Sequence, residues 1–190
     1  MPFIKFGLEH MQKGALGAII IQDSAGSGQA LKSNVEILKK HSLLASVKMP
    51  TDLFMPQAGV QTSVYIFKAH EPHDYEKPVK FIDFRNDGFK RTKRGLNEAS
   101  NPTKRYEEII KIYKAGLNAK VSKELWGALE TIYIEDFIAK PRENKHAKDF
   151  NFEAHQRNDT KPELEDFKRT IADYLSYEVS LILKNQTPPK

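Results

Sequence analysis

Residues 43–68, LLASVKMPTDLFMPQAGVQTSVYIFK, constrain the fold of this chain more than any other segment. An apolar stretch at residues 43–49 predicts a buried β-strand that stops at Pro50, because proline cannot donate a ladder hydrogen bond. Residues 62–67 alternate and are rich in β-branched and aromatic side chains, which predicts a second strand. The short link between the two strands carries Phe54 and permits an antiparallel arrangement.

The residues before this segment indicate a parallel crossover. Residues 15–21 are a short, continuous and partly β-branched apolar run, which is typical of a buried strand. Leu31, Val35 and Leu38 then mark the apolar face of a helix. A strand joined through a helix to the next strand is the pattern of a parallel βαβ unit. With a further strand at residues 79–84, the sequence predicts a mixed α/β sheet.

The pattern changes near residue 90. Residues 86–88, Asn-Asp-Gly, are a strong turn signal. Beyond it, four apolar or aromatic residues are spaced as one face of a helix: Tyr106, Ile109, Ile110 and Tyr113. Residues 164–182 carry a second, longer helical pattern. We therefore expect a sheet-forming part at residues 1–90 and a mainly helical region at residues 91–190.

Composition excludes several classes of protein. The chain has 190 residues, of which 39% are hydrophobic and 29% charged, as is typical of a globular protein with a buried core. No apolar run approaches the roughly 18 residues that are needed to span a bilayer. Because there is no cysteine, disulfides, thiolate metal sites and cysteine nucleophiles are excluded, and we expect a cytoplasmic location. No metal site is expected from His70 and His73 either, because Pro72 breaks the helical spacing.

A basic cluster follows the predicted turn. The chain has a net charge of +5, and part of this excess is local, in Lys90, Arg91, Lys93 and Arg94. Such a cluster can neutralise DNA phosphates and bind nucleic acid in a salt-dependent way. The alternative interpretation is a solvated loop without a partner.

A glycine-containing loop lies between the strand at residues 15–21 and the helix that follows it. Asp23, Gly26 and Gly28 belong to this loop. Glycines in this setting let backbone N–H groups approach a phosphate or carboxylate at the positive end of a helix. The loop is therefore a candidate cofactor or anion site, and the alternative is a turn that needs backbone freedom.

Residues 43–68 closely resemble the late part of the catalytic domain of adenine-specific (N6) DNA methyltransferases, the modification subunits of restriction-modification systems. The resemblance extends over nearly the whole chain, since residues 81–89 resemble the strand and turn that follow in such subunits. Residues 149–153 and 159–167 resemble the entry to their C-terminal region. The resemblance implies a partial Rossmann-like methyltransferase sheet, made of late strands in mixed parallel and antiparallel order, followed by a helical C-terminal region. Residues 1–90 would then be the C-terminal half of the methyltransferase catalytic domain, and residues 91–190 the mainly helical C-terminal region.

The resemblance also implies a role for Phe54, which matches the position of the aromatic residue that this family stacks on the target base. An enzyme that methylates an adenine amino group takes the base out of the duplex, and an aromatic face then holds it by stacking. The alternative is that Phe54 packs into the core below the loop. Such subunits use S-adenosylmethionine as methyl donor, adenine in duplex DNA as acceptor, and a separate specificity subunit as partner.

The chain departs from the family pattern in one respect that decides catalysis. The family's Asn-Pro-Pro-aromatic motif is absent, and the nearest sequence, at residues 101–103, lacks the second proline and the aromatic residue. In the family's chain order the cofactor loop precedes that motif and the Phe-containing loop follows it. We therefore interpret the loop with Gly26 and Gly28 as one that follows a later strand and does not hold the methyl donor.

These observations together predict a truncated or split methyltransferase. We expect no catalytic residue in this chain, no S-adenosylmethionine bound by the chain alone, and no membrane contact. Its expected partners are DNA, a specificity subunit and a complementary chain with the N-terminal half of the methyltransferase. The alternatives are a non-catalytic module that binds DNA or another subunit, and a gene remnant without retained function.

Overall fold

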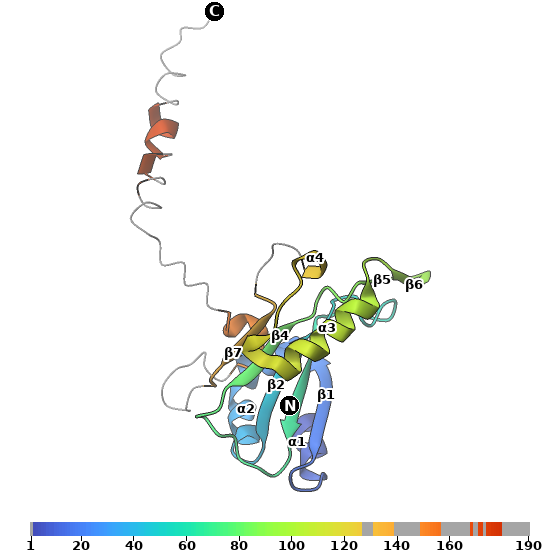
Figure 1. The fold of residues 1–190 in the computed structure, drawn as a ribbon. Helices are drawn as coiled ribbons and strands as arrows, with labels where there is room; N and C mark the ends of the chain where they lie inside the picture. Colours follow the sequence, from blue (N-terminus) through green and yellow to red (C-terminus); the bar gives the residue numbers. More distant parts are fainter. Residues whose placement is uncertain are drawn as a thin grey trace, which may run out of the picture. The chain divides into compact units, whose positions relative to one another are not determined.

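The fold is described by a computed structural model. It describes residues 2–126, 131–138, 149–156, 168, 171–172 and 174–179 (Figure 1). The chain divides into two compact units, Met1–Gln156 and Arg157–Lys190. The described residues of the second unit are helical and belong to the helix predicted for residues 164–182. The other residues of that predicted helix lie outside the described ones.

The first unit is built on a five-stranded sheet with the spatial order β1-β3-β2-β4-β7. Its strands, in chain order, are β1 (Leu16–Gln22), β2 (Ser42–Lys48), β3 (Thr62–Lys68), β4 (Val79–Asp83) and β7 (Tyr133–Asp136). The first four of these strands lie within a residue or two of the predicted ranges. β-Branched and aromatic side chains therefore predict these strands correctly, because they suit a buried pleated surface.

The strand directions confirm a mixed α/β sheet. β3 lies between β1 and β2 and is antiparallel to both, as the short link before it permits. β1 and β2 therefore run in the same direction, with α2 between them in the chain, which is the predicted crossover. β4 is parallel to β2, and β7 is antiparallel to β4. The carboxyl ends of β1, β2 and β4 thus lie at the same edge of the sheet.

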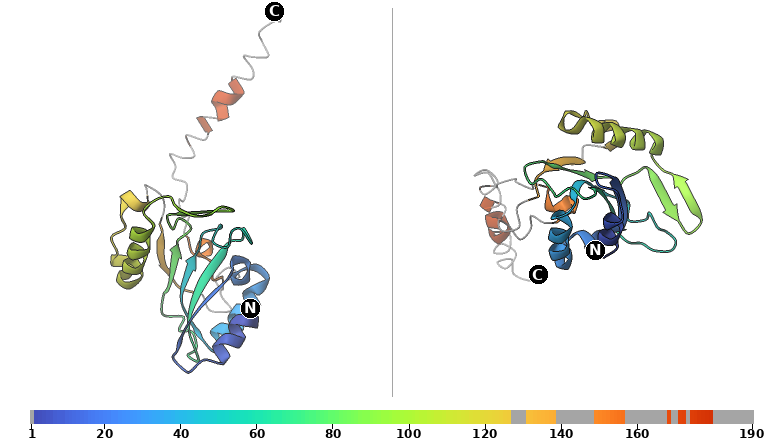
Figure 2. Two further views of the ribbon diagram at one scale, coloured as in Figure 1. Left: turned by 90° about the vertical axis from the view of Figure 1, so that its right-hand side faces the viewer. Right: turned by 90° about the horizontal axis from the view of Figure 1, so that it is seen from below.

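Helices cover both faces of the sheet, and α3 lies on the opposite side from α1 and α2 (Figure 2). The α-helices of the first unit are α1 (Pro2–Glu9), α2 (Leu31–Leu38), α3 (Pro102–Ala115) and α4 (Lys123–Trp126). Short 3-10 helices occur at η1 (Asp23–Gly26), η2 (Gly28–Ala30), η3 (Gly116–Asn118) and η4 (Phe152–Ala154).

Two hydrophobic cores lie on the two faces, because side chains alternate along each strand. Phe81 of β4 belongs to the core beneath α1 and α2, whereas its neighbour Ile82 belongs to the core beneath α3 and α4. The first core contains Ile4, Leu8, Ile37, Leu38, Leu43, Tyr65, Phe67, Ala69, Val79, Phe81, Ile138, Phe150 and Phe152. The second contains Ile82, Phe84, Ile112, Trp126 and Tyr133. The sheet is therefore buried on both sides at β4.

The buried face of α3 is rotated relative to the predicted one. Ile112 is fully buried, and Ile109 and Tyr113 pack against the second core. Ile110, which the spacing assigned to the buried face, is 54% exposed. Tyr106 is partly exposed and directs its hydroxyl to a carboxylate of the preceding turn.

A β-hairpin follows the turn at residues 86–88, where the sequence predicted a change to helix. β5 (Phe89–Thr92) and β6 (Gly95–Glu98) form a separate antiparallel sheet. Gly88 permits this exit, because its φ of 86° lies in the left-handed region and its carbonyl accepts from the N–H groups of Ala99 and Ser100. β6 is exposed along its whole length. Its sequence, GLNE, does not alternate between buried apolar and exposed polar residues, which is the pattern from which a strand is predicted.

The first unit continues well beyond residue 90. Residues 91–156 contribute β6, α3, α4 and also β7, which completes the main sheet. The expected boundary between residues 90 and 91 falls inside β5. The assignment of residues 1–90 to a catalytic-domain half and of residues 91–190 to a C-terminal region stays a prediction about function. Among the described residues, no helix is both long and apolar enough to cross a membrane.

Candidate functional site

The turn after β2 presents Phe54 to solvent. Residues 51–57 leave the carboxyl end of β2 as a series of turns. The side chain of Gln61 ties them to the sheet, because its amide donates to the carbonyl of Met49 and its oxygen accepts from the hydroxyl of Thr51 at 3.1 Å. The Phe54 ring is 41% exposed and belongs to neither hydrophobic core. A large apolar ring face is thus available for stacking.

The hairpin β5–β6 is joined to this turn through Arg91. The backbone N–H of Arg91 donates to Asp52 Oδ2 at 2.9 Å, and its guanidinium lies 3.3 Å from Asp52 Oδ1. Asp87 accepts from both terminal nitrogens of the same guanidinium, at 3.3 and 2.5 Å. The hydrogen bond with Asp87 raises the pKa of Arg91, which therefore remains a cation. Two carboxylates thus hold one arginine between the turn and the hairpin.

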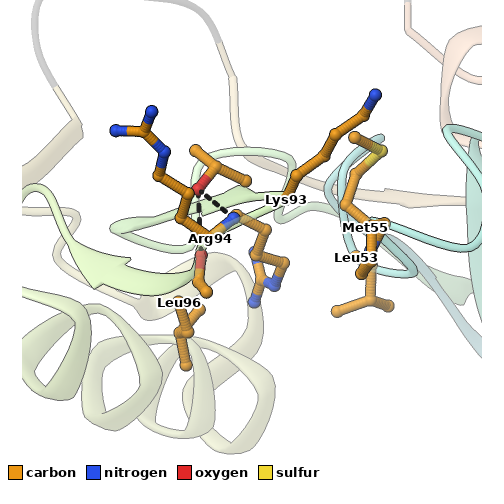
Figure 3. Close-up of a pocket in the computed structure, with 9 residues that line it drawn as sticks. Leu53, Met55, Lys93, Arg94 and Leu96 are labelled. Atoms are coloured by element: carbon orange, nitrogen blue, oxygen red, sulfur yellow. Dashed lines mark hydrogen bonds between the residues drawn. The ribbon is translucent and has the colours of Figure 1, made fainter.

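A pocket of about 400 Å³ lies between the turn and the hairpin (Figure 3). It is lined by Leu53, Met55, Pro56, Arg91, Thr92, Lys93, Arg94, Gly95 and Leu96. The turn supplies apolar walls, and the hairpin supplies cations and one further apolar side chain. Such a surface suits a ligand that has both a flat apolar part and an anionic part.

The four basic residues predicted to contact phosphates fall into two groups. Lys90, Lys93 and Arg94 are exposed on the hairpin. The side chain of Arg91 is only 12% exposed and is engaged by carboxylates. Lys93 and Arg94 line the pocket, whereas Phe54 is not among its lining residues. The turn that carries Phe54 does line the pocket, through Leu53, Met55 and Pro56, so the predicted base-stacking and phosphate-binding residues lie on two segments that meet.

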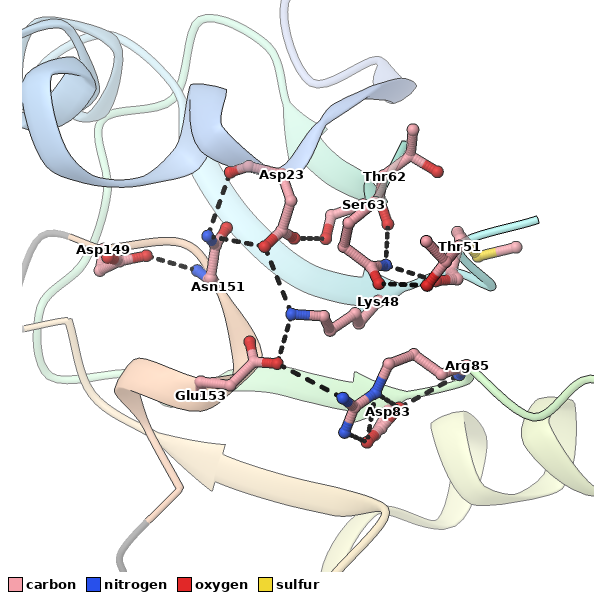
Figure 4. Close-up of polar contacts among 12 residues, drawn as sticks. Asp23, Lys48, Thr51, Thr62, Ser63, Asp83, Arg85, Asp149, Asn151 and Glu153 are labelled. Atoms are coloured by element: carbon pink, nitrogen blue, oxygen red, sulfur yellow. Dashed lines mark hydrogen bonds and ion pairs between the residues drawn. The ribbon is translucent and has the colours of Figure 1, made fainter. Parts of the chain in front are cut away.

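A polar cluster occupies the carboxyl ends of β1, β2 and β4 (Figure 4). Lys48, at the end of β2, is nearly buried, and its ammonium group pairs with Asp23 at 3.3 Å and with Glu153. Asp23 also accepts from the hydroxyl of Ser63 at 2.5 Å and from the side-chain amide of Asn151 at 3.1 Å. Both oxygens of the Asp23 carboxylate thus bind groups of the protein itself.

Gly26 lies where no side chain fits. A Cβ at this position would lie 2.1 Å from the hydroxyl of Tyr65 and 2.5 Å from Asn151 Oδ1. The Gly26 carbonyl accepts from the side chain of Asn34 at 2.7 Å and from the N–H of Phe150 at 3.0 Å. Burial is the main cause that raises the pKa of the Tyr65 hydroxyl, which stays protonated and donates to Asn151 at 2.6 Å. The glycine therefore admits a close approach of the chain's own residues 149–153.

These contacts bear on whether the loop with Asp23, Gly26 and Gly28 could bind S-adenosylmethionine. A loop that binds a cofactor must leave its polar side chains and its glycine backbone free to contact that ligand. Here Asp23 pairs with Lys48 and Ser63, while Gly26 is buried against Tyr65 and Asn151. Gly28 is the exposed member, with a φ of 55° and open space beside it. The residues of this loop do not fit the cofactor.

No cluster suitable for a metal ion occurs among the described residues. His70 lies in a turn, where its backbone N–H donates to His41 Nδ1 at 3.0 Å. His73 is buried and its ring packs edge-on against Tyr75.

The N-6 DNA methylase family model matches residues 1–164 of this chain, which is most of its length. The chain belongs to the N-6 DNA methylase family. No curated protein matches it. Members of this family generally transfer a methyl group from S-adenosylmethionine.

Two solved structures similar to this N-6 DNA methylase chain are subunits of restriction systems. One is a modification subunit of a putative type I restriction enzyme from Vibrio vulnificus YJ016, with 13% identity and a TM-score of 0.51 over 79% of this chain and 30% of that chain. Another is a type I restriction-modification system methyltransferase subunit from Streptococcus thermophilus, with 20% identity and a TM-score of 0.48 over 64% of this chain and 25% of that chain. This chain thus spans about a third or less of those two structures. The likeness to the first shows that the two chains share a fold.

Sequence reasoning on this chain missed several residues of the site. Asp52 was not predicted as a site residue, and Asp87 was interpreted as part of the turn at residues 86–88. Asp87 does serve the turn, since it accepts from the N–H of Phe89 at 3.0 Å, but it also binds Arg91. Lys48 stands in an otherwise apolar strand, and an ionisable residue there signals a buried partner.

Proposed function

We propose that this N-6 DNA methylase chain supplies the target-base and DNA-backbone contacts of an adenine-specific DNA methyltransferase in a restriction-modification system. The observation that carries the proposal is the meeting of two segments: the turn with the exposed ring of Phe54, and the hairpin with Lys93 and Arg94. A flipped adenine would stack on Phe54, and the flanking phosphates would meet the cations of the hairpin.

The chain by itself does not catalyse methyl transfer under this proposal. It has no Asn-Pro-Pro-aromatic motif to orient the adenine amino group for in-line attack on the methyl sulfonium. Positioning of this kind accounts for roughly 7–11 kcal/mol of a reaction barrier, which an aromatic stacking residue does not replace. The loop with Asp23 and Gly26 is engaged internally, so no site for the methyl donor is proposed on it.

A complementary chain with the N-terminal half of the methyltransferase is the first proposed partner. β1 is the terminal strand on one side of the described sheet, and its second edge pairs with none of the described strands. Leu16 and Ile20 of β1 are 66% and 44% exposed. An apolar strand with an unpaired edge favours addition of another strand, which supports this partner. A specificity subunit that reads the DNA sequence is the second proposed partner, and a cytoplasmic location stays a prediction.

A non-catalytic module that binds DNA is the second candidate function, and the exposed cations of the hairpin favour it equally. The two candidates differ in their need for a donor-binding partner. Restoration of methyl transfer when the chain is mixed with an N-terminal methyltransferase half would support the first candidate. DNA binding without restoration by any such half would support the second. A gene remnant would show neither activity.

Two titrations of the purified chain test the proposal. Calorimetry with S-adenosylmethionine should give no heat at concentrations well above the micromolar range, and one-to-one binding would overturn the assignment of the Asp23 loop. Fluorescence anisotropy with a labelled duplex should give an affinity that falls steeply with salt. A salt-independent affinity, or no binding at low salt, would overturn the DNA-contact function.

A further inference from the structure

Asp52 holds Arg91 by two different groups. Asp52 Oδ2 accepts from the backbone N–H of Arg91 at 2.9 Å, and Asp52 Oδ1 lies 3.3 Å from the guanidinium. Asp52 belongs to the turn that carries Phe54, and Arg91 belongs to β5. Because one carboxylate binds both the backbone and the side chain of Arg91, it fixes the position and the orientation of the strand at this point.

Asp87 also holds the same guanidinium, because it accepts from both of its terminal nitrogens. Asp87 Oδ2 pairs with Arg91 at 2.5 Å and accepts from the hydroxyl of Tyr106 at 3.2 Å. The Asp87 side chain is 1% exposed, so it is fixed within the protein at the base of the hairpin. The single positive charge of Arg91 therefore faces two negative charges, and its side chain is only 12% exposed where it lines the pocket. An arginine in this state is a poor ligand for a DNA phosphate.

We propose that Asp52 and Arg91 form a latch between the turn and the hairpin, and that Arg91 is a positioning residue that sets Lys93 and Arg94 for DNA phosphates without binding phosphate itself. This inference rests on the proposed DNA-contact function and assigns its phosphate-binding residues. Lys93 and Arg94 follow Arg91 by two and three residues, at the turn of the hairpin and along the pocket wall. The latch sets their distance from the turn that presents Phe54.

The latch is tested by removing Asp52 and comparing the result with a matched change. Asp52→Ala and Glu98→Ala each remove one carboxylate and raise the net charge by one, and Glu98 is exposed on the same hairpin. If Arg91 is a phosphate ligand masked by Asp52, both substitutions should strengthen DNA binding. Under the latch, Asp52→Ala weakens binding and lowers the salt slope by about 1–2, because Lys93 and Arg94 lose their position. Glu98→Ala leaves the affinity equal to the wild type or stronger.

Hydrogen exchange of the whole chain gives a readout that does not need DNA. In Asp52→Ala, the amides of residues 51–58 and 89–98 should exchange faster, while those of β2 and β3 keep their protection. Asp52→Asn keeps an oxygen acceptor without the charge and should fall between the wild type and Asp52→Ala. It also serves as the test variant if Asp52→Ala does not fold, with Glu98→Gln as its control.

The outcomes separate the latch from the function on which it rests. A wild-type chain without salt-dependent DNA binding overturns the proposed function together with the latch. A wild-type chain that binds DNA, with Asp52→Ala as tight as Glu98→Ala, overturns the latch alone. Unchanged exchange of residues 89–98 in Asp52→Ala also overturns it. Loss of both DNA affinity and hairpin protection in Asp52→Ala, with neither lost in Glu98→Ala, supports it.

Discussion

Lys48 Nζ lies 3.3 Å from Asp23 Oδ2, and the same ammonium group contacts the carboxylate of Glu153. The Lys48 side chain is 8% exposed, so its charge is almost removed from water. Removal of one partner from such a pair leaves the other charge uncompensated. This cluster joins the loop after β1, the end of β2 and residues 149–156, and we infer that it locks the last segment of the first unit onto the sheet.

Substitution of Lys48 by methionine should therefore destabilise the chain strongly. Breaking a buried pair typically costs about 3–5 kcal/mol of unfolding free energy, and urea denaturation of Lys48→Met should show a loss of that order. Lys39→Met is the matched control, because Lys39 pairs with Glu36 on an exposed surface of α2. The control should change stability by less than about 0.5 kcal/mol. Equal effects of the two substitutions would contradict a structural role of the Lys48 cluster.

Gly26→Ala should destabilise the chain, because the added methyl group would clash with the Tyr65 hydroxyl. The added Cβ would lie 2.1 Å from the Tyr65 hydroxyl, and overpacking of this kind costs typically about 1–3 kcal/mol. Removal of that hydroxyl in Tyr65→Phe should reduce the additional cost of Gly26→Ala. A double-mutant cycle measured by thermal unfolding checks the coupling. Additive effects would show that the clash is relieved elsewhere.

Phe54→Ala should reduce DNA binding with little effect on folding. Base stacking on an aromatic side chain is worth about 1–3 kcal/mol, so the affinity for a duplex with a mismatched adenine should fall by about 5- to 150-fold. The melting temperature should change little, because the ring lies outside both cores. Phe3→Ala is the control, since Phe3 is 82% exposed on α1 and should alter neither quantity. A large loss of stability without loss of affinity would favour the core-packing interpretation of Phe54.

Stability should decrease as the pH falls below about 6.5, the ordinary pKa of histidine. Burial lowers the pKa of His73, and burial also lowers that of His41, so both favour the neutral form in the folded chain. A lowered folded-state pKa means that the unfolded chain binds more protons near and below pH 6.5, and protonation then favours unfolding. Stability from these groups is complete above the unfolded pKa and is lost in acid.

His73→Phe checks this dependence. Phenylalanine keeps a ring against Tyr75 and cannot titrate, so the decline of the melting temperature between pH 7.5 and 5.5 should become shallower. His10→Phe changes an exposed histidine and should leave the decline as it is. A His73→Phe profile parallel to that of the wild type would show that other groups cause the acid sensitivity.

The sequence by itself predicted β1, β2, β3 and β4 to within two residues at each end, because β-branched and aromatic runs between turn signals are local properties. It did not predict the hairpin β5–β6, since Gly95–Glu98 is exposed throughout and carries no apolar alternation. It also did not predict β7, because the four residues Tyr133–Asp136 are too few to show a clear alternation.

The sequence also predicted two parts of the candidate site, Phe54 and the basic cluster that includes Lys93 and Arg94. Only the tertiary structure decided that their segments meet and that Arg91 pairs with Asp52 and Asp87. The same holds for the pairing of Asp23 with Asn151, which are 128 residues apart. Periodicity reports which side of its own element a residue faces, whereas a contact between distant residues depends on strand order and register. Those are decided by packing of the whole chain, which no local pattern contains.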